Sequence, residues 1–167
     1  MTTQISGNTG VSQCQPNSVS QDDLQSGVVG KGPAFSATGA VVASVVNVAS
    51  KVPVQTVVFD TNACYDATNS RFLPNVAGYY QLNCTGGNQV AVDTLGVYIQ
   101  LRKNGDTTLA QGGSTGNANA FARGSASAVT YFNGTTDYVE VWITPAGGSG
   151  TMNVICSDFN GAMVRAV

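Results

Sequence analysis

The residue types that carry out most enzyme chemistry are scarce in this chain. It contains no histidine, which excludes Ser-His and Cys-His pairs as well as imidazole metal sites. Glycoside hydrolysis needs two facing carboxylic acids, and the candidates are Glu140, the single glutamate, with Asp137 or Asp158. Turn chemistry and a solvated strand face explain the two aspartates better. We therefore expect no enzymatic activity.

Four cysteines are present, and their spacing contains no CxxC pair of the kind that binds zinc or exchanges disulfides: Cys14, Cys64, Cys84 and Cys156. Four cysteines allow three pairings, and synthesis in a cytoplasm argues against any pairing forming early. We expect Cys84 to be a small buried hydrophobe. Cys14 lies in a polar segment and is either a bystander thiol, which we favour, or a crosslink to a neighbouring protein.

The composition of the chain limits the classes of partner that it can bind. Only 10% of the 167 residues are charged and the net charge is -2, so the chain lacks the basic stripe that neutralises phosphates, and we expect no nucleic-acid ligand. The longest apolar run, residues 41–48, is too short to span a bilayer, and no membrane insertion is expected. The N-terminus resembles no secretory signal, which predicts synthesis in a cytoplasm.

From Pro33 onward, short β-branched and aromatic runs alternate with turn residues, which indicates an all-β sandwich. The chain before it, residues 1–32, is rich in Gly, Ser, Gln and Asn and is predicted to form an extended arm. The expected strands are 34–37, 40–48, 54–59, 71–73, 78–85, 95–103, 107–111, 120–132, 138–144 and 152–165.

Two Asn-Gly pairs predict the places where strands reverse. Asn104-Gly105 follows the strand expected at 95–103, and Asn133-Gly134 follows the strand expected at 120–132. Because Asn and Gly both accept positive φ, each pair predicts a tight hairpin turn.

The run from Arg71 to Cys84 predicts a strand, a corner and a core strand. Phe72 closes an apolar strand, and Pro74 cannot donate to a ladder and ends it. Gly78 allows a bend, and Tyr80 then shares one face with the alternate residues that follow it.

This run resembles the signature of the complement C1q globular head, a jelly roll shared with the tumour necrosis factor family. Phe72, Gly78 and Tyr80 match that signature, and Phe159 with Gly161 resembles the final Phe-x-Gly strand of the family. Leu82 and Cys84 depart from it, since the family usually has aromatics there. The resemblance covers residues 33–167 and implies a C1q/TNF-like sandwich of antiparallel strands that forms a homotrimer. It also implies that Cys156 lies near Cys84, since the last strand of the family pairs with the strand after the glycine corner.

A surplus of large aromatics agrees with a trimer, because period-two strands must place some of them outside the core. The candidate trimer contacts are Tyr79, Tyr98, Tyr131 and Trp142, with Phe121 and Tyr138 as further exposed aromatics. The alternative is that several of them lie in the core.

Some C1q-like heads bind calcium near the apex, so aspartates in or near the predicted loops are considered as calcium ligands. The candidates are Asp60, Asp66, Asp93 and Asp106. Their spacing matches no calcium-loop motif, and turn formation is the favoured interpretation, so we expect no cofactor.

Within the arm, residues 7–12 and 16–24 resemble segments that precede C1q-like heads in phage tail fibres and other small virion proteins. A phage particle, assembled in a bacterial cytoplasm and released by lysis, reconciles cytoplasmic synthesis with a low-charge surface. We therefore expect a virion surface protein whose arm binds other virion proteins.

The first interpretation is a tail fibre or tail appendage whose head touches the host surface, with glycan as the expected partner, through outward loops that contain Ser114, Asn117 and Ser149. The second is a capsid decoration protein whose trimer staples coat subunits. A cellular C1q-like signalling ligand would need collagen-like repeats, which are absent.

Overall fold

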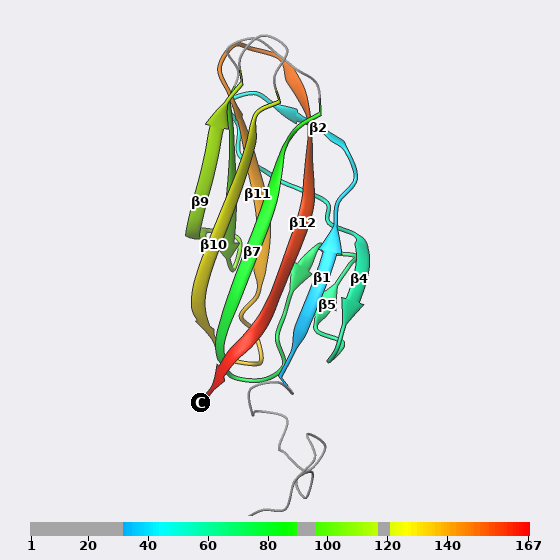
Figure 1. The fold of residues 1–167 in the computed structure, drawn as a ribbon, viewed down its shortest axis with the longest axis vertical. Helices are drawn as coiled ribbons and strands as arrows, with labels where there is room; N and C mark the ends of the chain where they lie inside the picture. The colour runs from blue at the N-terminus through cyan, green and yellow to red at the C-terminus, as the bar shows by residue number, and fades with distance from the viewer. Residues whose placement is uncertain (1–31, 90–95, 117–120) are drawn as a thin grey trace, which may run out of the picture.

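Two antiparallel sheets form a sandwich in the computed structural model, which describes residues 32–89, 96–116 and 121–167 (Figure 1). These described residues form twelve strands and no helix, so none of them makes a helix able to cross a membrane. The predicted arm, residues 1–32, lies outside the described residues except for Gly32, and so does Cys14.

The first sheet, called the β7 sheet, has the order β10-β7-β12-β1-β4, and β2 also pairs with β12. Its strands are β1 (Ala34–Thr38), β2 (Val42–Val45), β4 (Thr56–Asp60), β7 (Gly78–Asn88), β10 (Arg123–Phe132) and β12 (Thr151–Ala166).

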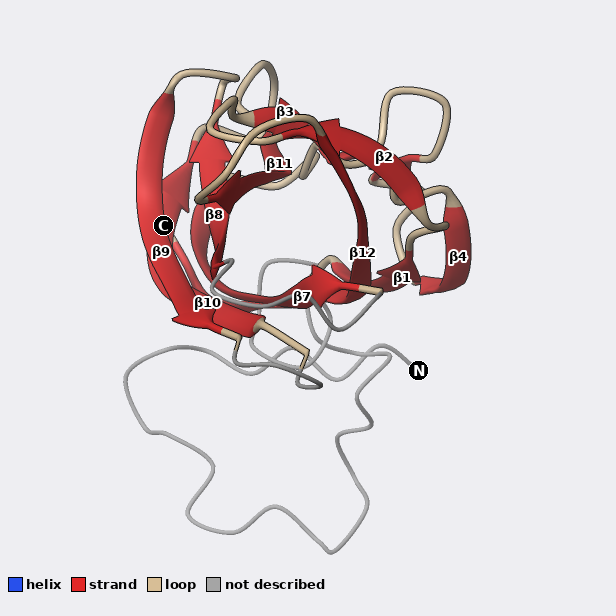
Figure 2. Ribbon diagram, turned by 90° about the horizontal axis from the view of Figure 1, so that it is seen from above, coloured by secondary structure: helices blue, strands red, loops and turns tan. Residues whose placement is uncertain are grey.

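The second sheet, called the β11 sheet, has the order β5-β6-β11-β8-β9, and β3 also pairs with β11. Its strands are β3 (Ser50–Lys51), β5 (Tyr65–Asp66), β6 (Arg71–Phe72), β8 (Gly96–Lys103), β9 (Thr107–Thr115) and β11 (Val139–Ala146). Figure 2 shows the two sheets curving around a shared interior, with β9 beside β10 on one side.

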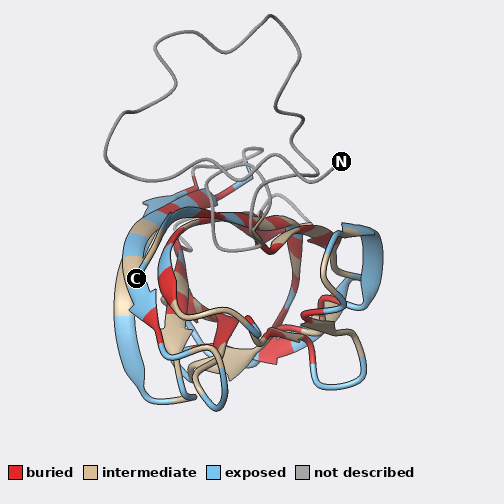
Figure 3. Ribbon diagram, turned by 90° about the horizontal axis from the view of Figure 1, so that it is seen from below, coloured by how far each residue is buried: buried red, intermediate tan, exposed pale blue. Residues whose placement is uncertain are grey.

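The core between the sheets is built around a cluster of aromatic rings. Phe35 of one sheet stacks on Phe72 of the other at a centroid distance of 4.2 Å. Tyr80 lies 5.6 Å from Phe72 and 5.6 Å from Phe132, and Phe159 meets Phe35 edge-on at 4.8 Å. All five rings are fully buried, as expected for Phe72 and Tyr80 (Figure 3 shows the buried stretches facing the interior).

The corner before β7 requires glycine because of a close backbone approach. A Cβ at Gly78 would lie 2.5 Å from the carbonyl oxygen of Arg165 on β12. Gly161, the other glycine of the signature, is surrounded by core side chains, since its Cβ would lie 2.7 Å from Leu82 Cδ2 and 3.0 Å from Phe35 Cε1. Both glycines therefore allow contacts that a side chain would prevent.

One of the two predicted hairpins is confirmed. Asn104 and Gly105 have φ values of 55° and 85°, and the chain returns from β8 directly into β9 of the same sheet. The hairpin predicted at Asn133-Gly134 is wrong, because β10 and β11 belong to different sheets. The Asn133 side chain instead accepts hydrogen bonds from the backbone N–H groups of Thr135, Thr136 and Asp137, which shapes a wider crossing loop.

The strand predicted at 40–48 is shorter in the structure, where β2 spans Val42–Val45. Asn47 has a φ of 63°, and its N–H donates to the carbonyl oxygen of Pro145 at 2.7 Å. This left-handed residue ends β2, and the chain then moves to the β11 sheet as β3. Asn47 thus sets the position of a change of sheet that residue periodicity did not indicate.

We expect Phe72→Ala to lower the free energy of unfolding by about 3–5 kcal/mol, because it removes the ring that joins the two sheets and leaves a cavity. Ser149→Ala, at an exposed loop position, is the control and should change stability by no more than about 0.5 kcal/mol. Thermal and denaturant unfolding of the two purified variants measures the contrast. Equal stability of the two would show that the aromatic cluster does not hold the sandwich together.

Candidate assembly interface

The outer face of the β7 sheet has an apolar end. Tyr79 of β7 lies opposite Tyr131 of β10, with ring centroids 5.7 Å apart, and both side chains are about two-fifths exposed, at 42% and 40%. Val129 and Val164 are exposed beside them and share with Tyr79 the lining of a surface depression. We call these four residues the tyrosine patch. Grouped apolar side chains on a surface indicate a contact site.

Strand alternation explains why the patch faces outward. Tyr80 and Leu82 point into the core, so Tyr79 and Gln81 must point to the opposite side. The end of β10 is held in place by Lys103, whose ammonium group donates to the carbonyl oxygen of Tyr131 at 2.8 Å.

Lys103 also forms an ion pair with Asp137 at 2.8 Å. Burial alone would raise the pKa of Asp137, but hydrogen bonds from Lys103 and Asn104 outweigh it and hold this pKa below its usual value. Asp137 is therefore a structural carboxylate of the crossing loop and is charged at neutral pH.

A strip of amide and hydroxyl groups continues across the same face from the tyrosine patch. Asn83 Nδ2 donates to Asn160 Oδ1 at 3.1 Å, and Asn160 Nδ2 donates to Asp158 Oδ2 at 2.5 Å. On the other side of Asn83, Gln81 and Ser127 both donate to its Oδ1, at 3.3 and 2.9 Å. Three neighbouring strands are therefore linked by side chains as well as by their ladders.

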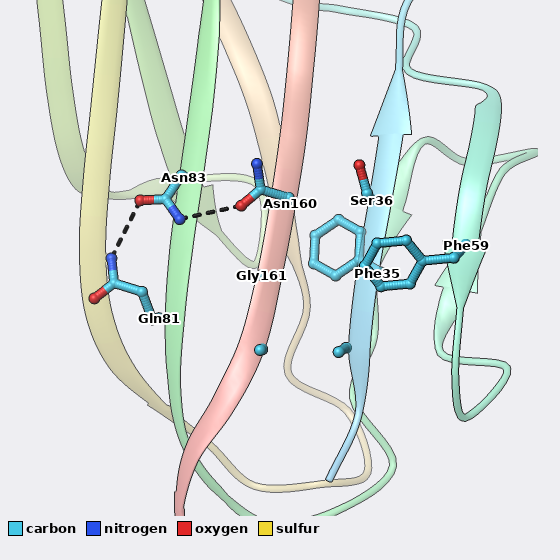
Figure 4. Close-up of a pocket in the computed structure, with 9 residues that line it drawn as sticks. Phe35, Ser36, Phe59, Gln81, Asn83, Asn160 and Gly161 are labelled. Atoms are coloured by element: carbon cyan, nitrogen blue, oxygen red, sulfur yellow. Dashed lines mark hydrogen bonds between the residues drawn. The ribbon is translucent and has the colours of Figure 1, made fainter. Parts of the chain in front are cut away.

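A shallow groove of about 380 Å³ lies on this face where β12, β1 and β4 meet (Figure 4). Phe59 of β4, which is 48% exposed, lines one part of the groove, and the amides of Gln81, Asn83 and Asn160 line another. The face thus combines apolar surface with polar groups whose geometry is fixed, as binding surfaces do.

The four aromatics predicted as candidate trimer contacts lie on two different faces. Tyr79 and Tyr131 are together in the tyrosine patch, whereas Tyr98 and Trp142 lie on the outer face of the β11 sheet. Trp142 is only partly exposed. Trimer contact through either pair stays a prediction, because the two pairs belong to strands of separate sheets.

The outward loop expected at 112–117 is wrong in its described part, because residues 112–115 continue β9. Ser114 donates to the carbonyl oxygen of Arg123 at 2.6 Å and accepts from its N–H at 2.8 Å, which ties β9 to β10. Gly112 permits this approach, since a Cβ there would lie 1.8 Å from the carbonyl oxygen of Ser125. Asn117 lies outside the described residues, and Ser149 is exposed in the β11–β12 loop.

The aspartates considered as calcium ligands are separate from one another. Asp60 accepts backbone N–H groups of Cys64 and Tyr65 at 3.0 and 2.8 Å, and Asp66 is bonded to Asn69 and Arg71. Asp106 accepts from the Thr107 hydroxyl, and Asp93 lies outside the described residues. No three acidic or cysteine side chains within the described ranges gather as metal ligands.

The carboxylates considered for catalysis also occupy three separate environments. Glu140 is buried in an ion pair with Lys51, Asp137 pairs with Lys103, and Asp158 accepts from Asn160. Their individual partners give each of them a structural role.

Three cysteines lie in the described core as free, buried thiols: Cys64, Cys84 and Cys156. Cys84 and Cys156 are on adjacent strands of the β7 sheet, as expected. Burial raises the pKa of Cys84 to about 12 and raises the pKa of Cys156 further.

Sequence reasoning missed the groove, because it predicted a strand at 54–59 without indicating that this strand lies at the edge of a sheet. In the structure Val57, Val58 and Phe59 lie on the edge strand β4 and are all exposed. The alternation of Gln81 and Asn83 with core residues was a usable signal for the polar strip. No local pattern identifies Phe59 as part of a groove, since its exposure depends on its position at the sheet edge.

Comparisons with known proteins show which known fold the two sheets share. The chain matches no protein-family model, and no curated protein matches its sequence. The solved globular domain of zebrafish complement 1qA protein is similar, with a TM-score of 0.60 and 19% identity, over 81% of this chain and 99% of that one.

Two further structures are similar. Murine APRIL at pH 5.0 gives a TM-score of 0.57 with 14% identity, over 80% of this chain and 100% of that one. Eiger TNF from S. frugiperda gives 0.55 with 14% identity, over 81% and 95%. At these identities the likeness establishes the fold, a C1q/TNF-like jelly roll, as the signature residues implied.

We expect the thiols of Cys84 and Cys156 to resist alkylation in the folded protein at pH 8. Their raised pKa values keep them protonated, and the thiolate is the reactive form. Iodoacetamide treatment followed by mass spectrometry should label both only after denaturation. Labelling in the native state at the rate of a free cysteine would contradict the buried placement.

Proposed function

We propose that this chain is a non-enzymatic bacteriophage virion surface protein, a homotrimeric C1q-like head that engages the host surface as part of a tail fibre or tail appendage. The C1q/TNF-like fold supports a head domain of this kind. The observation that carries the proposal is the tyrosine patch, an apolar surface on a rigid sheet that has no covering element within the described residues.

Trimer formation through the β7 sheet explains the patch and the groove together. Tyr79, Tyr131 and the groove residue Phe59 are all exposed on the same sheet, so one packing arrangement buries them all. Such burial removes large aromatic surface from water, which drives association. The β11 sheet then faces away from the neighbouring subunits.

The positions of the first and last residues of the head support one orientation of the head on the particle. Pro33 accepts a hydrogen bond from the N–H of Met163 at 3.0 Å, so the head begins near the end of β12, and the C-terminus lies at the same end (Figure 1). The β11–β12 loop lies at the opposite end. An anchor on the N-terminal side therefore directs this loop, with Ser149, outward.

The outward loop is braced. Asn47 Oδ1 accepts from the N–H of Gly147 at 3.1 Å, and Asn47 Nδ2 donates to the carbonyl oxygen of Gly148 at 3.3 Å. A braced loop loses little conformational freedom on binding, which suits a contact surface.

Cryo-electron microscopy of the particle, with the protein located in the density, tests the proposal directly. Density at the tail is the expected result. Density on the capsid lattice would identify the protein as a capsid decoration protein, and absence from the particle would reject both virion roles.

We expect the purified full chain to sediment as a trimer, with about three times the 17.1 kDa mass of one chain, at micromolar concentration. Tyr131→Glu places a charge in the tyrosine patch and should shift the species toward monomer, since burial of an unpaired charge is costly. Tyr98→Ala, on the other sheet, is the control and should remain trimeric. Analytical ultracentrifugation separates these outcomes, and a monomeric wild-type chain would refute the trimer.

A further inference from the structure

The outer face of the β11 sheet carries aromatic, amide and charged side chains in a cross-strand arrangement. Register places Trp142 of β11 between Lys51 of β3 and Gln100 of β8, and Gln100 opposite Gln111 of β9. Tyr98 follows on β8, two residues from Gln100 on the same face. These side chains form a continuous surface opposite to the face assigned to the trimer.

The Tyr98 ring lies against the backbone of a neighbouring strand. Gly113 is its cross-strand partner, and a Cβ at Gly113 would lie 2.6 Å from Tyr98 Cδ1 and 3.2 Å from Cε1. The ring therefore occupies the space that a side chain at Gly113 would fill, while 42% of Tyr98 is exposed. An aromatic ring packed on one side and open on the other is a stacking platform.

The Arg102 guanidinium is held in a fixed position without a carboxylate. It stacks over the Trp142 ring, 4.5 Å from the centroid, and donates through Nε and Nη2 to Gln100 Oε1 at 2.9 and 2.6 Å. The ion pairs of the described residues do not include Arg102. Gln100 is itself hydrogen-bonded to Gln111, so the Arg102 guanidinium belongs to a network of hydrogen bonds. It uses two of its five N–H donors there, which leaves others to bind a ligand.

The nearby acidic group is already neutralised. Glu140 is buried, pairs with Lys51 and accepts a hydrogen bond from Trp142 Nε1 at 3.1 Å. Register also places Glu140 opposite Arg102, so this surface carries one carboxylate for two cations, Lys51 and Arg102, and a net positive charge remains. The surface is therefore complementary to an anionic ligand with an apolar ring face.

We propose that this face binds an acidic saccharide, with one sugar ring packed on Tyr98 and the carboxylate of an adjacent sugar held by Arg102. Sugar rings present C–H groups on one face, and a planar guanidinium binds a carboxylate with two parallel hydrogen bonds. Tyr98 and Gln100, which anchors the guanidinium, are about 7 Å apart along the strand, so the ring contact and the carboxylate contact involve different parts of the ligand. The exposed Gln111 amide is placed for a hydroxyl.

This inference rests on the proposed host-surface role and names its ligand. It moves the contact from the loops to the β11 sheet, which the proposed trimer leaves free. The ligand class follows from the net positive charge of this surface and the exposed Tyr98 ring.

Titration calorimetry of the full-length protein with an oligogalacturonate, and with a neutral galacto-oligosaccharide of the same length, tests the inference. We expect the acidic oligosaccharide to bind more tightly, and its binding to weaken as salt is added. Tyr98→Ala should weaken binding of the acidic oligosaccharide by about two- to tenfold through loss of stacking. Arg102→Gln should weaken it by more than about tenfold and remove the preference over the neutral sugar.

Thr107→Ala is the matched control, because Thr107 lies at the start of β9 and its hydroxyl bonds only the neighbouring Asp106. It should bind as the wild type does. Thermal unfolding of each variant checks the fold, and Gln111→Ala, at an exposed position, replaces Tyr98→Ala if that variant unfolds. Absence of binding at millimolar acidic sugar, or unchanged binding by Arg102→Gln, would overturn the inference.

Failure of this inference and failure of the proposed function give different results. A trimer found at the phage tail that binds neither sugar rejects the saccharide site alone. A protein that binds oligogalacturonate through Arg102 but is absent from the particle rejects the virion role and keeps the site.

Discussion

The stacked contact of Phe35 with Phe72 is the interaction on which the rest of the structure depends, because it joins strands of opposite sheets at the centre of the core. Gly161 leaves the space for it, since a side chain there would reach Phe35. These rings set the distance between the sheets. Along each strand, successive side chains then point alternately into the core and toward water.

Two chemically different outer faces follow from that alternation. On the β7 sheet, Tyr79 and Tyr131 form an apolar end beside amides that bond one another. On the β11 sheet, Arg102 and Trp142 form a cation–aromatic pair next to Tyr98. The first face suits association with an identical subunit, and the second suits a charged, ring-shaped ligand. In the proposed arrangement, the sandwich assembles through one layer and binds its ligand through the other.

The sequence predicted the features whose causes are local. Asn104-Gly105 forms the expected turn because both residues adopt positive φ without tertiary help. The signature residues Phe72 and Tyr80 were identified as core residues because they lie beside a chain-breaking proline and a glycine. Ser114 and Asn133 were misinterpreted, because Ser114 is held by Arg123 of the neighbouring strand and the chain at Asn133 crosses to the other sheet. The division of the aromatics between two faces required knowledge of sheet order, and the groove at Phe59 required knowledge of the sheet edge.

The burial of Cys84 and Cys156 protects the fold from changes in the redox state of its surroundings. Thiols that are sealed in the core and stay protonated do not respond to the redox potential around the protein. These two side chains therefore keep the same covalent structure in a reducing medium and in an oxidising one. The packing of the β7 sheet around these thiols is therefore set when the chain folds, and it does not change with the redox state of the medium.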